Sequence, residues 1–194
     1  MTDDGGGSPA RARGAGPALP EITVRGADER DLPALAALRR AWAQERGHIA
    51  PGADPGFEET FAAWWRVEQP RRSFWLAEVG DARVGVTAVG SLNVAEVVSM
   101  PVPGRRSERW GYVGNLVVLE DFRTRGVPRR LLAAAIGHAR TRGYQRLVLR
   151  PSASGAAFYR AAGFRPVGDD MVVLDTVPRA DRGPGPPVRS TDVP

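Results

Sequence analysis

The chain has 194 residues and a formal net charge of +5, a length that suits one domain with a sizeable core. It contains no cysteine, which excludes disulfides and a cysteine nucleophile, and no lysine, which excludes Schiff-base chemistry. No apolar run is long enough to span a membrane and the N-terminus has no apolar signal region, so we expect a cytoplasmic protein. The two histidines, His48 and His138, belong to no metal-binding pattern, so we expect no metal site.

Apolar periodicity predicts alternating strands and helices between two tails that lack it. The tails, residues 1–20 and 178–194, are rich in Gly and Pro and are expected to be disordered, which leaves residues 21–177 as one folded domain. The elements expected in chain order are a strand over 22–25, a helix that Asp31 caps, a helix over 57–68, strands over 73–79 and 83–89 joined by a Gly80-Asp81 turn, a strand over 110–119, a helix that contains Leu131 and Leu132 and ends at Gly143, a strand over 146–149, a short helix over 154–162 and a strand over 171–174. This order indicates an α/β fold with a mixed central β-sheet flanked by helices.

A basic turn separates the strand that ends near Leu119 from the helix that contains Leu131 and Leu132. It reads Arg123-Thr124-Arg125-Gly126-Val127-Pro128-Arg129-Arg130. The start of a helix has unpaired N–H groups and the positive end of the macrodipole, so this turn suits an anion such as a pyrophosphate. An ordinary solvated helix cap has the same local pattern, and the turn alone does not distinguish the two.

The distribution of charge favours a small polyanion over a nucleic acid. Between residues 123 and 168 the chain has ten arginines and no Asp or Glu, whereas the acidic residues are numerous in the first two-thirds. A nucleic-acid surface needs aromatic side chains interleaved with the basic ones, and this half of the chain offers only Tyr144, Phe158, Tyr159 and Phe164. We therefore expect neither a nucleic-acid nor a membrane partner.

Two motifs resemble those of the GNAT superfamily of acetyl-CoA-dependent N-acyltransferases. The first is Asn115-Leu116-Val117-Val118 followed by Glu120 to Pro128, where the family has a strand N-L-x-V leading into P-E-x-R-x-x-G-x-G/A. The second is Ala157-Phe158-Tyr159-Arg160-Ala161-Ala162-Gly163-Phe164, where the family has a helix x-x-Y-x-x-x-G-F. The order and separation of the motifs also match, and the resemblance covers about residues 22–174. It implies a single GNAT-like domain with acetyl-CoA as cosubstrate.

The resemblance also implies roles for individual residues. Those expected to hold acetyl-CoA are Leu116, Val117 and Val118 along the pantetheine arm, and Arg123, Thr124, Arg125, Gly126, Val127, Pro128 and Arg129 around the pyrophosphate. Tyr159 matches the tyrosine that in many relatives acts as general acid to the leaving thiolate. Pro128 stands where the family has Gly or Ala, so one phosphate donor is lost. Glu120 stands where the family usually has Pro, in what we expect to be a surface turn.

No residue identifies itself as the base that removes a proton from the acceptor amine. Asn115 occupies a strand position where some relatives carry a carboxylate, and it can orient a water or the substrate. Glu45, Glu58 and Glu59 are other candidates, and a relay through water is a further alternative.

The acceptor site is expected between the first two helices and the loop around Met100, as in the superfamily. The aromatic residues in this part either form a pocket for a small amine or belong to the core; they are Trp42, His48, Phe57, Phe61, Trp64 and Trp65. We expect an N-acetyltransferase that acts on a primary amine of a small molecule or peptide, with Tyr159 as general acid. The alternative is a catalytically weak acyl-CoA sensor of the same fold, and a homodimer is compatible with either.

Overall fold

The computed structural model describes residues 21–81, 85–168 and 171–176, so the expectations about the two tails lie outside the described residues. The strands are β1 (Glu21–Gly26), β2 (Arg72–Asp81), β3 (Gly85–Val98), β4 (Arg109–Val118), β5 (Arg146–Leu149), β6 (Arg165–Val167) and β7 (Met171–Asp175). The helices are α1 (Leu32–Glu45), α2 (Phe57–Glu68), α3 (Val127–Thr141) and α4 (Ala156–Ala161), with short 3-10 turns η1 (Glu29–Asp31), η2 (Gln69–Arg71) and η3 (Glu120–Phe122).

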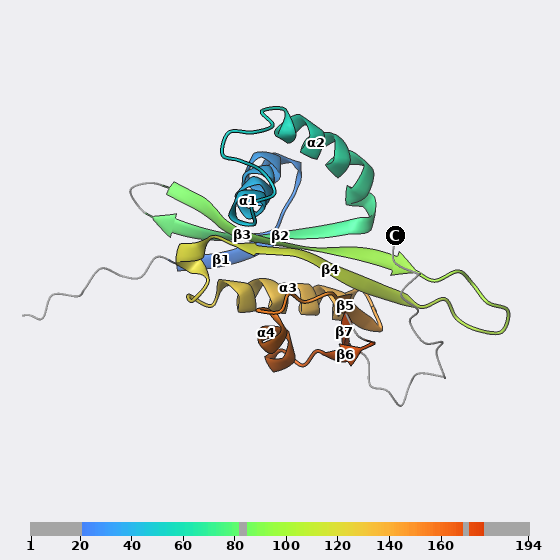
Figure 1. Ribbon diagram of the computed structural model, residues 1–194. Coiled ribbons are helices and arrows are strands. Elements are labelled where there is room, and N and C mark those ends of the chain that lie inside the picture. Colours follow the sequence, from blue (N-terminus) through green and yellow to red (C-terminus); the bar gives the residue numbers. More distant parts are fainter. Residues whose placement is uncertain (1–20, 82–84, 169–170, 177–194) are drawn as a thin grey trace, which may run out of the picture.

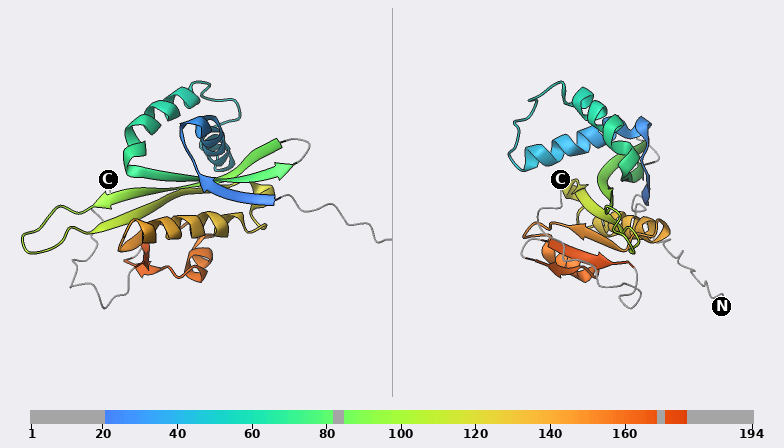
Figure 2. Two further views of the ribbon diagram at one scale, coloured as in Figure 1. Left: turned by 180° about the vertical axis from the view of Figure 1, so that it is seen from behind. Right: turned by 90° about the vertical axis from the view of Figure 1, so that its right-hand side faces the viewer.

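All the described strands belong to one twisted sheet with helices on both faces (Figure 1 and Figure 2). The strand order is β1-β2-β3-β4-β5-β7-β6, and only the pair β4–β5 is parallel. The parallel pair is possible because α3 connects β4 to β5 as a crossover helix. The expected α/β fold with a mixed sheet flanked by helices is therefore confirmed.

The two faces of the sheet are buried against different helices (Figure 1). α3 covers one face through an apolar stripe that includes Leu131, and α1 and α2 cover the other through residues such as Leu38 and Trp65. Along β2, Phe74 belongs to the core beneath α1 and α2, whereas the next residue, Trp75, belongs to the core beneath α3. A strand with two buried faces alternates in this way because successive side chains point to opposite sides.

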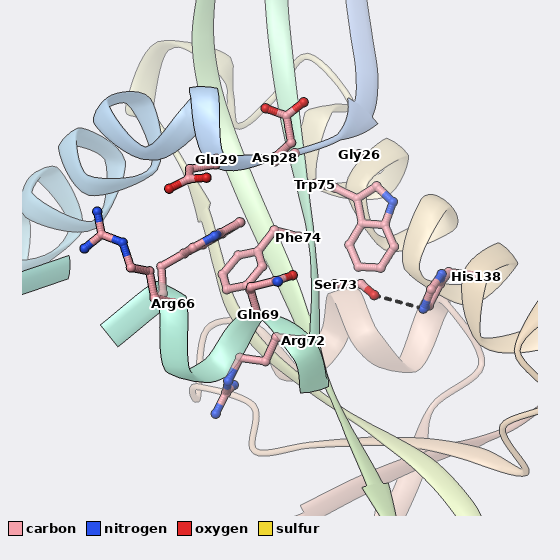
Figure 3. Close-up of a pocket in the computed structure, with 12 residues that line it drawn as sticks. Gly26, Asp28, Glu29, Arg66, Gln69, Arg72, Ser73, Phe74, Trp75 and His138 are labelled. Atoms are coloured by element: carbon pink, nitrogen blue, oxygen red, sulfur yellow. Dashed lines mark hydrogen bonds between the residues drawn. The ribbon is translucent and has the colours of Figure 1, made fainter. Parts of the chain in front are cut away.

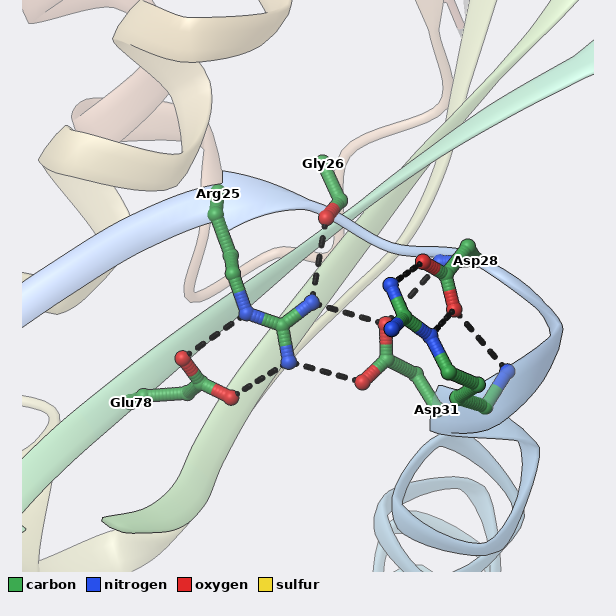
Figure 4. A network of polar contacts seen from close by, with 6 residues as sticks. Arg25, Gly26, Asp28, Asp31 and Glu78 are labelled. Carbon is green, nitrogen blue, oxygen red and sulfur yellow. Dashed lines mark hydrogen bonds and ion pairs between the residues drawn. The ribbon is translucent and has the colours of Figure 1, made fainter.

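A network centred on Arg25 fixes the start of α1 against the sheet (Figure 4). The Arg25 guanidinium donates to both carboxylate oxygens of Asp31, at 2.8 and 2.7 Å, and to both of Glu78, at 3.0 and 2.6 Å. Asp31 also accepts the backbone N–H of Asp28, whose carboxylate in turn accepts the N–H of Arg30. Asp31 thus stands before α1 as expected, but its side chain accepts hydrogen bonds from Arg25 and from the N–H of Asp28 and makes no cap bond to α1. The Arg25 hydrogen bonds lower the pKa of Asp31.

Strand β3 is longer than the sequence predicts, because Gly90 continues the strand and does not end it. A Cβ atom at Gly90 would lie 2.9 Å from the Val117 carbonyl oxygen and 3.3 Å from a methyl group of Leu131. Glycine therefore permits the close approach of β3, β4 and α3 at this point. The pairing of β3 with β2 continues on both sides of Gly90, and the pairing of β3 with β4 begins at Gly90 and Val118.

Two further details of the sheet differ from expectation. Gly80 and Asp81, expected as a hairpin turn, are strand residues paired with Val86 and Gly85. The connection between β2 and β3 must therefore lie within residues 82–84, outside the described residues. The short edge strand β6 was not predicted, because its three residues are too few to show an alternating pattern.

Candidate active site

The central strands β4 and β5 separate soon after they pair. Tyr112 pairs with Val148, and β4 then continues to Val118 with no strand on its β5 side in the described part of the chain. The backbone of residues 113–118 therefore borders a gap in the middle of the sheet. An unpaired strand edge can bind an extended ligand as an additional strand. The residues expected along the pantetheine arm, 116–118, lie within this segment.

A β-bulge in β4 interrupts this segment. Between Gly114 and Val117, β4 has one residue more than β3 has between the corresponding partners. Asn115 takes up the extra length with a φ of 52°, a left-handed conformation that Asn adopts more readily than most residues. Beyond the bulge the side chain of Val117 packs beneath α1 and α2, on the side where Asn115 lines a cavity.

The basic turn connects β4 to α3, as the sequence predicts. Gly126 is the N-cap of α3 and has a φ of 78°, and open space surrounds the position of a Cβ, so backbone conformation and not crowding requires glycine. Pro128 lies in the first helical turn, where its missing N–H breaks no helical hydrogen bond. The Arg130 N–H donates to the Gly126 carbonyl at 3.1 Å, while those of Val127 and Arg129 have no backbone acceptor among the described residues.

The arginines of the turn differ in their partners. Arg123 is engaged within the protein: Nε donates to the Val118 carbonyl at 2.9 Å and the guanidinium pairs with Glu45 at the end of α1. This hydrogen bond lowers the pKa of Glu45, which keeps the carboxylate ionised and bound to Arg123. Arg125 and Arg129 are exposed and form no ion pair in the part of the chain that the structure describes. The Arg125 guanidinium lies 5.2 Å from the ring centroid of Phe122, and both Arg125 and Arg129 keep N–H donors that an anion can accept.

Tyr159 lies on α4 and packs against the core on the α3 side. Its ring meets those of Phe158 and Phe164 edge-on, with centroids 5.0 and 5.7 Å away. Burial raises the pKa of Tyr159 to about 12, and its hydroxyl has no hydrogen-bond partner among the described residues. The hydroxyl therefore stays protonated at neutral pH and is available as a donor.

A cavity of about 350 Å³ lies on the α1 and α2 side of β4, at the lower end of the size range of small-molecule sites. Apolar and aromatic side chains make up most of its wall. Its described lining residues are Leu35, Arg39, Phe57, Thr60, Phe61, Trp64, Phe74, Ser91, Leu92, Asn93, Asn115 and Val117. Of the aromatic residues for which pocket and core were alternatives, Phe57, Phe61 and Trp64 are in this wall, and Phe61 and Trp64 also pack against the core.

Other residues expected around the acceptor lie elsewhere. Trp65 is buried in the core, and Trp42 lies beside His48, with ring centroids 5.2 Å apart. Met100 is 86 % exposed and is not among the described lining residues. Glu58 and Glu59 are exposed on α2, and the described wall of the cavity contains no carboxylate and no imidazole. No side chain of this wall can therefore act as a conventional base.

Arg39 is the charged residue among the described lining residues of the cavity, and sequence analysis did not identify it. Its Nη1 donates to Oδ1 of Asn115 at 2.7 Å, and its guanidinium lies 3.9 Å from the ring centroid of Trp42. Partial burial lowers its pKa, yet an arginine remains charged at any physiological pH. The signal was present in the sequence, because Leu35, Leu38, Arg39 and Trp42 share one face of a helix and the arginine interrupts an apolar stripe.

A second groove, of about 600 Å³, lies near the end of β1 (Figure 3). Ser73 Oγ and His138 Nε2 are 3.1 Å apart at one side of it, and burial lowers the pKa of His138. Asp28 and Arg66 border it elsewhere. No residue of β4 or of the basic turn is among its described lining residues, so this groove is separate from the elements that carry the motifs.

A mixed sheet that opens between β4 and β5, with a basic turn leading into the crossover helix, defines the class of fold to which acetyltransferases belong. The chain matches the family model described as the acetyltransferase (GNAT) family over residues 35–164, and it belongs to that family. No curated protein is significantly similar to it in sequence.

Solved structures confirm the fold. A predicted acetyltransferase with acetyl-CoA from Clostridium acetobutylicum has a TM-score of 0.62 at 20% identity, and the match covers 77% of this chain and 93% of that one. A GCN5-related N-acetyltransferase from Ralstonia eutropha has a TM-score of 0.57 at 20% identity, with coverage of 77% and 95%. Glucosamine-6-phosphate N-acetyltransferase from Arabidopsis thaliana has a TM-score of 0.58 at 13% identity, with coverage of 75% and 92%.

Within the described residues, no helix has both the length and the apolar character needed to cross a membrane. The same residues contain no group of three or more His, Asp or Glu side chains that could hold a metal ion.

Proposed function

We propose that the protein transfers the acetyl group of acetyl-CoA to a primary amine of a small molecule or peptide. The observation that carries this proposal is that three features meet at one end of β4: the unpaired edge, the free N–H groups at the start of α3, and the cavity beside Asn115. Membership of the GNAT family supports acetyl transfer in general.

The residues present fit acetyl-CoA, which supplies an activated acetyl thioester when bound. The N–H groups of Val127 and Arg129, together with the guanidinium groups of Arg125 and Arg129, suit the pyrophosphate. The backbone of residues 116–118 suits the amide groups of the pantetheine arm. Arg123 is engaged by Glu45 and Val118, so we assign it to holding β4 against α1.

Tyr159 serves in this proposal as the hydrogen-bond donor to the leaving thiolate. Its pKa of about 12 exceeds the value of about 8.5 of an ordinary thiol, so full proton transfer from the tyrosine is unfavourable. The hydroxyl therefore stabilises the thiolate while keeping its own proton. Asn115 positions Arg39 through the 2.7 Å hydrogen bond, and proton removal from the amine falls to water.

Calorimetric titration with CoA tests the cofactor site. We expect Gly126→Asp to abolish CoA binding, because it places a negative charge at the N-terminus of α3. In Gly126→Asn the new side chain has about the size of aspartate but no charge, and asparagine tolerates a positive φ, so this variant should retain most of the affinity for CoA. Gly137→Asp makes the same change at an exposed site further along α3 and is the matched control. Equal CoA binding by wild type and Gly126→Asp would show that the turn is not the pyrophosphate site.

Thiol release from acetyl-CoA in the presence of a panel of amines, amino acids and peptides tests the reaction. The absence of a carboxylate or imidazole from the described cavity wall favours the acyl-CoA sensor as the second candidate. A protein that binds CoA with no amine-dependent thiol release would support the sensor and refute the transferase.

A further inference from the structure

The guanidinium of Arg39 faces the cavity without a counter-charge. It forms no ion pair in the part of the chain that the structure describes, and every other described residue of the wall is uncharged. Its neighbour Arg40 is satisfied, because it donates to the carbonyl oxygens of Ala53 and Asp54 at 2.6 and 2.8 Å. Arg39 has five N–H donors and uses one of its nitrogens for Asn115, so most of its donors remain available to a ligand.

Two contacts hold this guanidinium in one orientation. Oδ1 of Asn115, on β4, accepts a hydrogen bond from Nη1 of the guanidinium. The ring of Trp42, in the next turn of α1, lies against one face of the guanidinium. A cation held this way loses little freedom when an anion binds, which favours binding. A planar guanidinium also matches a carboxylate through paired hydrogen bonds.

We propose that the acceptor amine carries a carboxylate, which Arg39 binds, and an apolar or aromatic body, which lies against Phe57, Phe61 and Trp64. This inference rests on the transferase function proposed above and names its substrate class. One guanidinium balances one negative charge, as a carboxylate supplies, and the cavity of about 350 Å³ suits a molecule of amino-acid size.

The charge of Arg39 also acts on the amine. A nearby cation disfavours the ammonium form of a bound acceptor, and the described wall offers no carboxylate to stabilise that form. The neutral amine, which is the nucleophile, is therefore favoured in the cavity without a protein base. The same repulsion disfavours acceptors with a second positive charge, such as polyamines.

Phenylalanine and phenylalaninamide test the proposal, because they share the amine and the aromatic body and differ at the carboxylate. The quantity to measure is kcat/KM for each compound at saturating acetyl-CoA. The ratio of the phenylalanine value to the amide value is then compared between variants, because the different basicity of the two amines affects every variant alike. Arg39→Gln should lower the phenylalanine-to-amide ratio about 10- to 150-fold, the effect of a lost hydrogen bond to a charged group. The ratio for Arg39→Lys should fall between those of wild type and Arg39→Gln. Arg140→Gln should keep the wild-type ratio, because Arg140 is an exposed residue of α3, which covers the opposite face of the sheet.

Calorimetric titration of both compounds into CoA-loaded protein gives a second measure that needs no turnover. We expect wild type to bind phenylalanine more tightly than the amide and Arg39→Gln to lose that difference, with melting curves to verify folding. An Arg39-independent ratio, or no binding of phenylalanine to wild type, overturns the carboxylate proposal. Arg39-dependent binding of phenylalanine without thiol release from any amine would keep this site and refute the transferase.

Discussion

Replacing Tyr159 by phenylalanine removes one hydroxyl that has no hydrogen-bond partner among the described residues. We therefore expect the free energy of unfolding to change by less than about 0.5 kcal/mol, as for a substitution that breaks no specific contact. Catalysis should suffer more, because a hydrogen bond to a charged group contributes about 1.5–3 kcal/mol, which corresponds to about 10- to 150-fold in kcat. Full general-acid transfer predicts up to about 10⁴-fold. The pKa of about 12 places the expected loss in the lower range.

Tyr144→Phe is the matched control for this experiment. The Tyr144 hydroxyl donates to Glu96 at 2.7 Å, and neither residue is among the described lining residues of the cavity, so the loss of this hydroxyl should cost about 1.5 kcal/mol and leave kcat unchanged. For a chain of this length that cost lowers the melting temperature by roughly 3–6 °C. Thiol release at saturating acetyl-CoA and a thermal melt of each variant complete the comparison.

The two tyrosine variants should thus show opposite effects. Tyr159→Phe should have a lower kcat and the stability of wild type, whereas Tyr144→Phe should have the kcat of wild type and a lower stability. Wild-type activity should also show no loss up to about pH 10 from ionisation of Tyr159, because its pKa lies near 12. A kcat of Tyr159→Phe within twofold of wild type would refute the role of the hydroxyl. An alkaline loss of activity near pH 9 that disappears in Tyr159→Phe would instead contradict a pKa of about 12 for this hydroxyl.

Two further predictions concern stability. Gly111→Ala places a methyl group 2.7 Å from side-chain carbons of Leu147 and Val94, so urea unfolding should show a loss of about 1–3 kcal/mol, and an unchanged midpoint would contradict this packing. Burial lowers the pKa of His138 in the folded chain, so below about pH 6.5 the unfolded chain binds a proton that the native chain does not. The free energy of unfolding therefore decreases as the pH is lowered. Melting temperatures at pH 7.5 and 5.5 should therefore differ less in His138→Gln than in wild type, and an equal difference would exclude His138 as the cause.

Local patterns were sufficient for the elements whose residues carry their own signals. α3 follows from Leu131, Ala135 and Ala139 at helical spacing, and its start follows from Gly126 and Pro128, whose backbone preferences suit an N-cap and a first turn. These signals depend only on neighbouring residues, so the fold class and the basic turn could be predicted without a structure. Gly90 shows the limit of such signals, because a glycine that ends a strand and one that permits close packing look the same in sequence.

The candidate acceptor site depends on residues that are distant in the chain. Arg39 of α1 and Asn115 of β4 are 76 residues apart, and only the packing of α1 on the sheet brings them within hydrogen-bond distance. The bulge that turns Asn115 toward Arg39 comes from the register between β3 and β4, which periodicity within one strand does not determine. The sequence by itself therefore determined the class of fold, the family and the basic turn. Tertiary packing alone decided which polar side chains meet beside the gap in the sheet, because such contacts arise from pairing between segments and not from the preferences of any one of them.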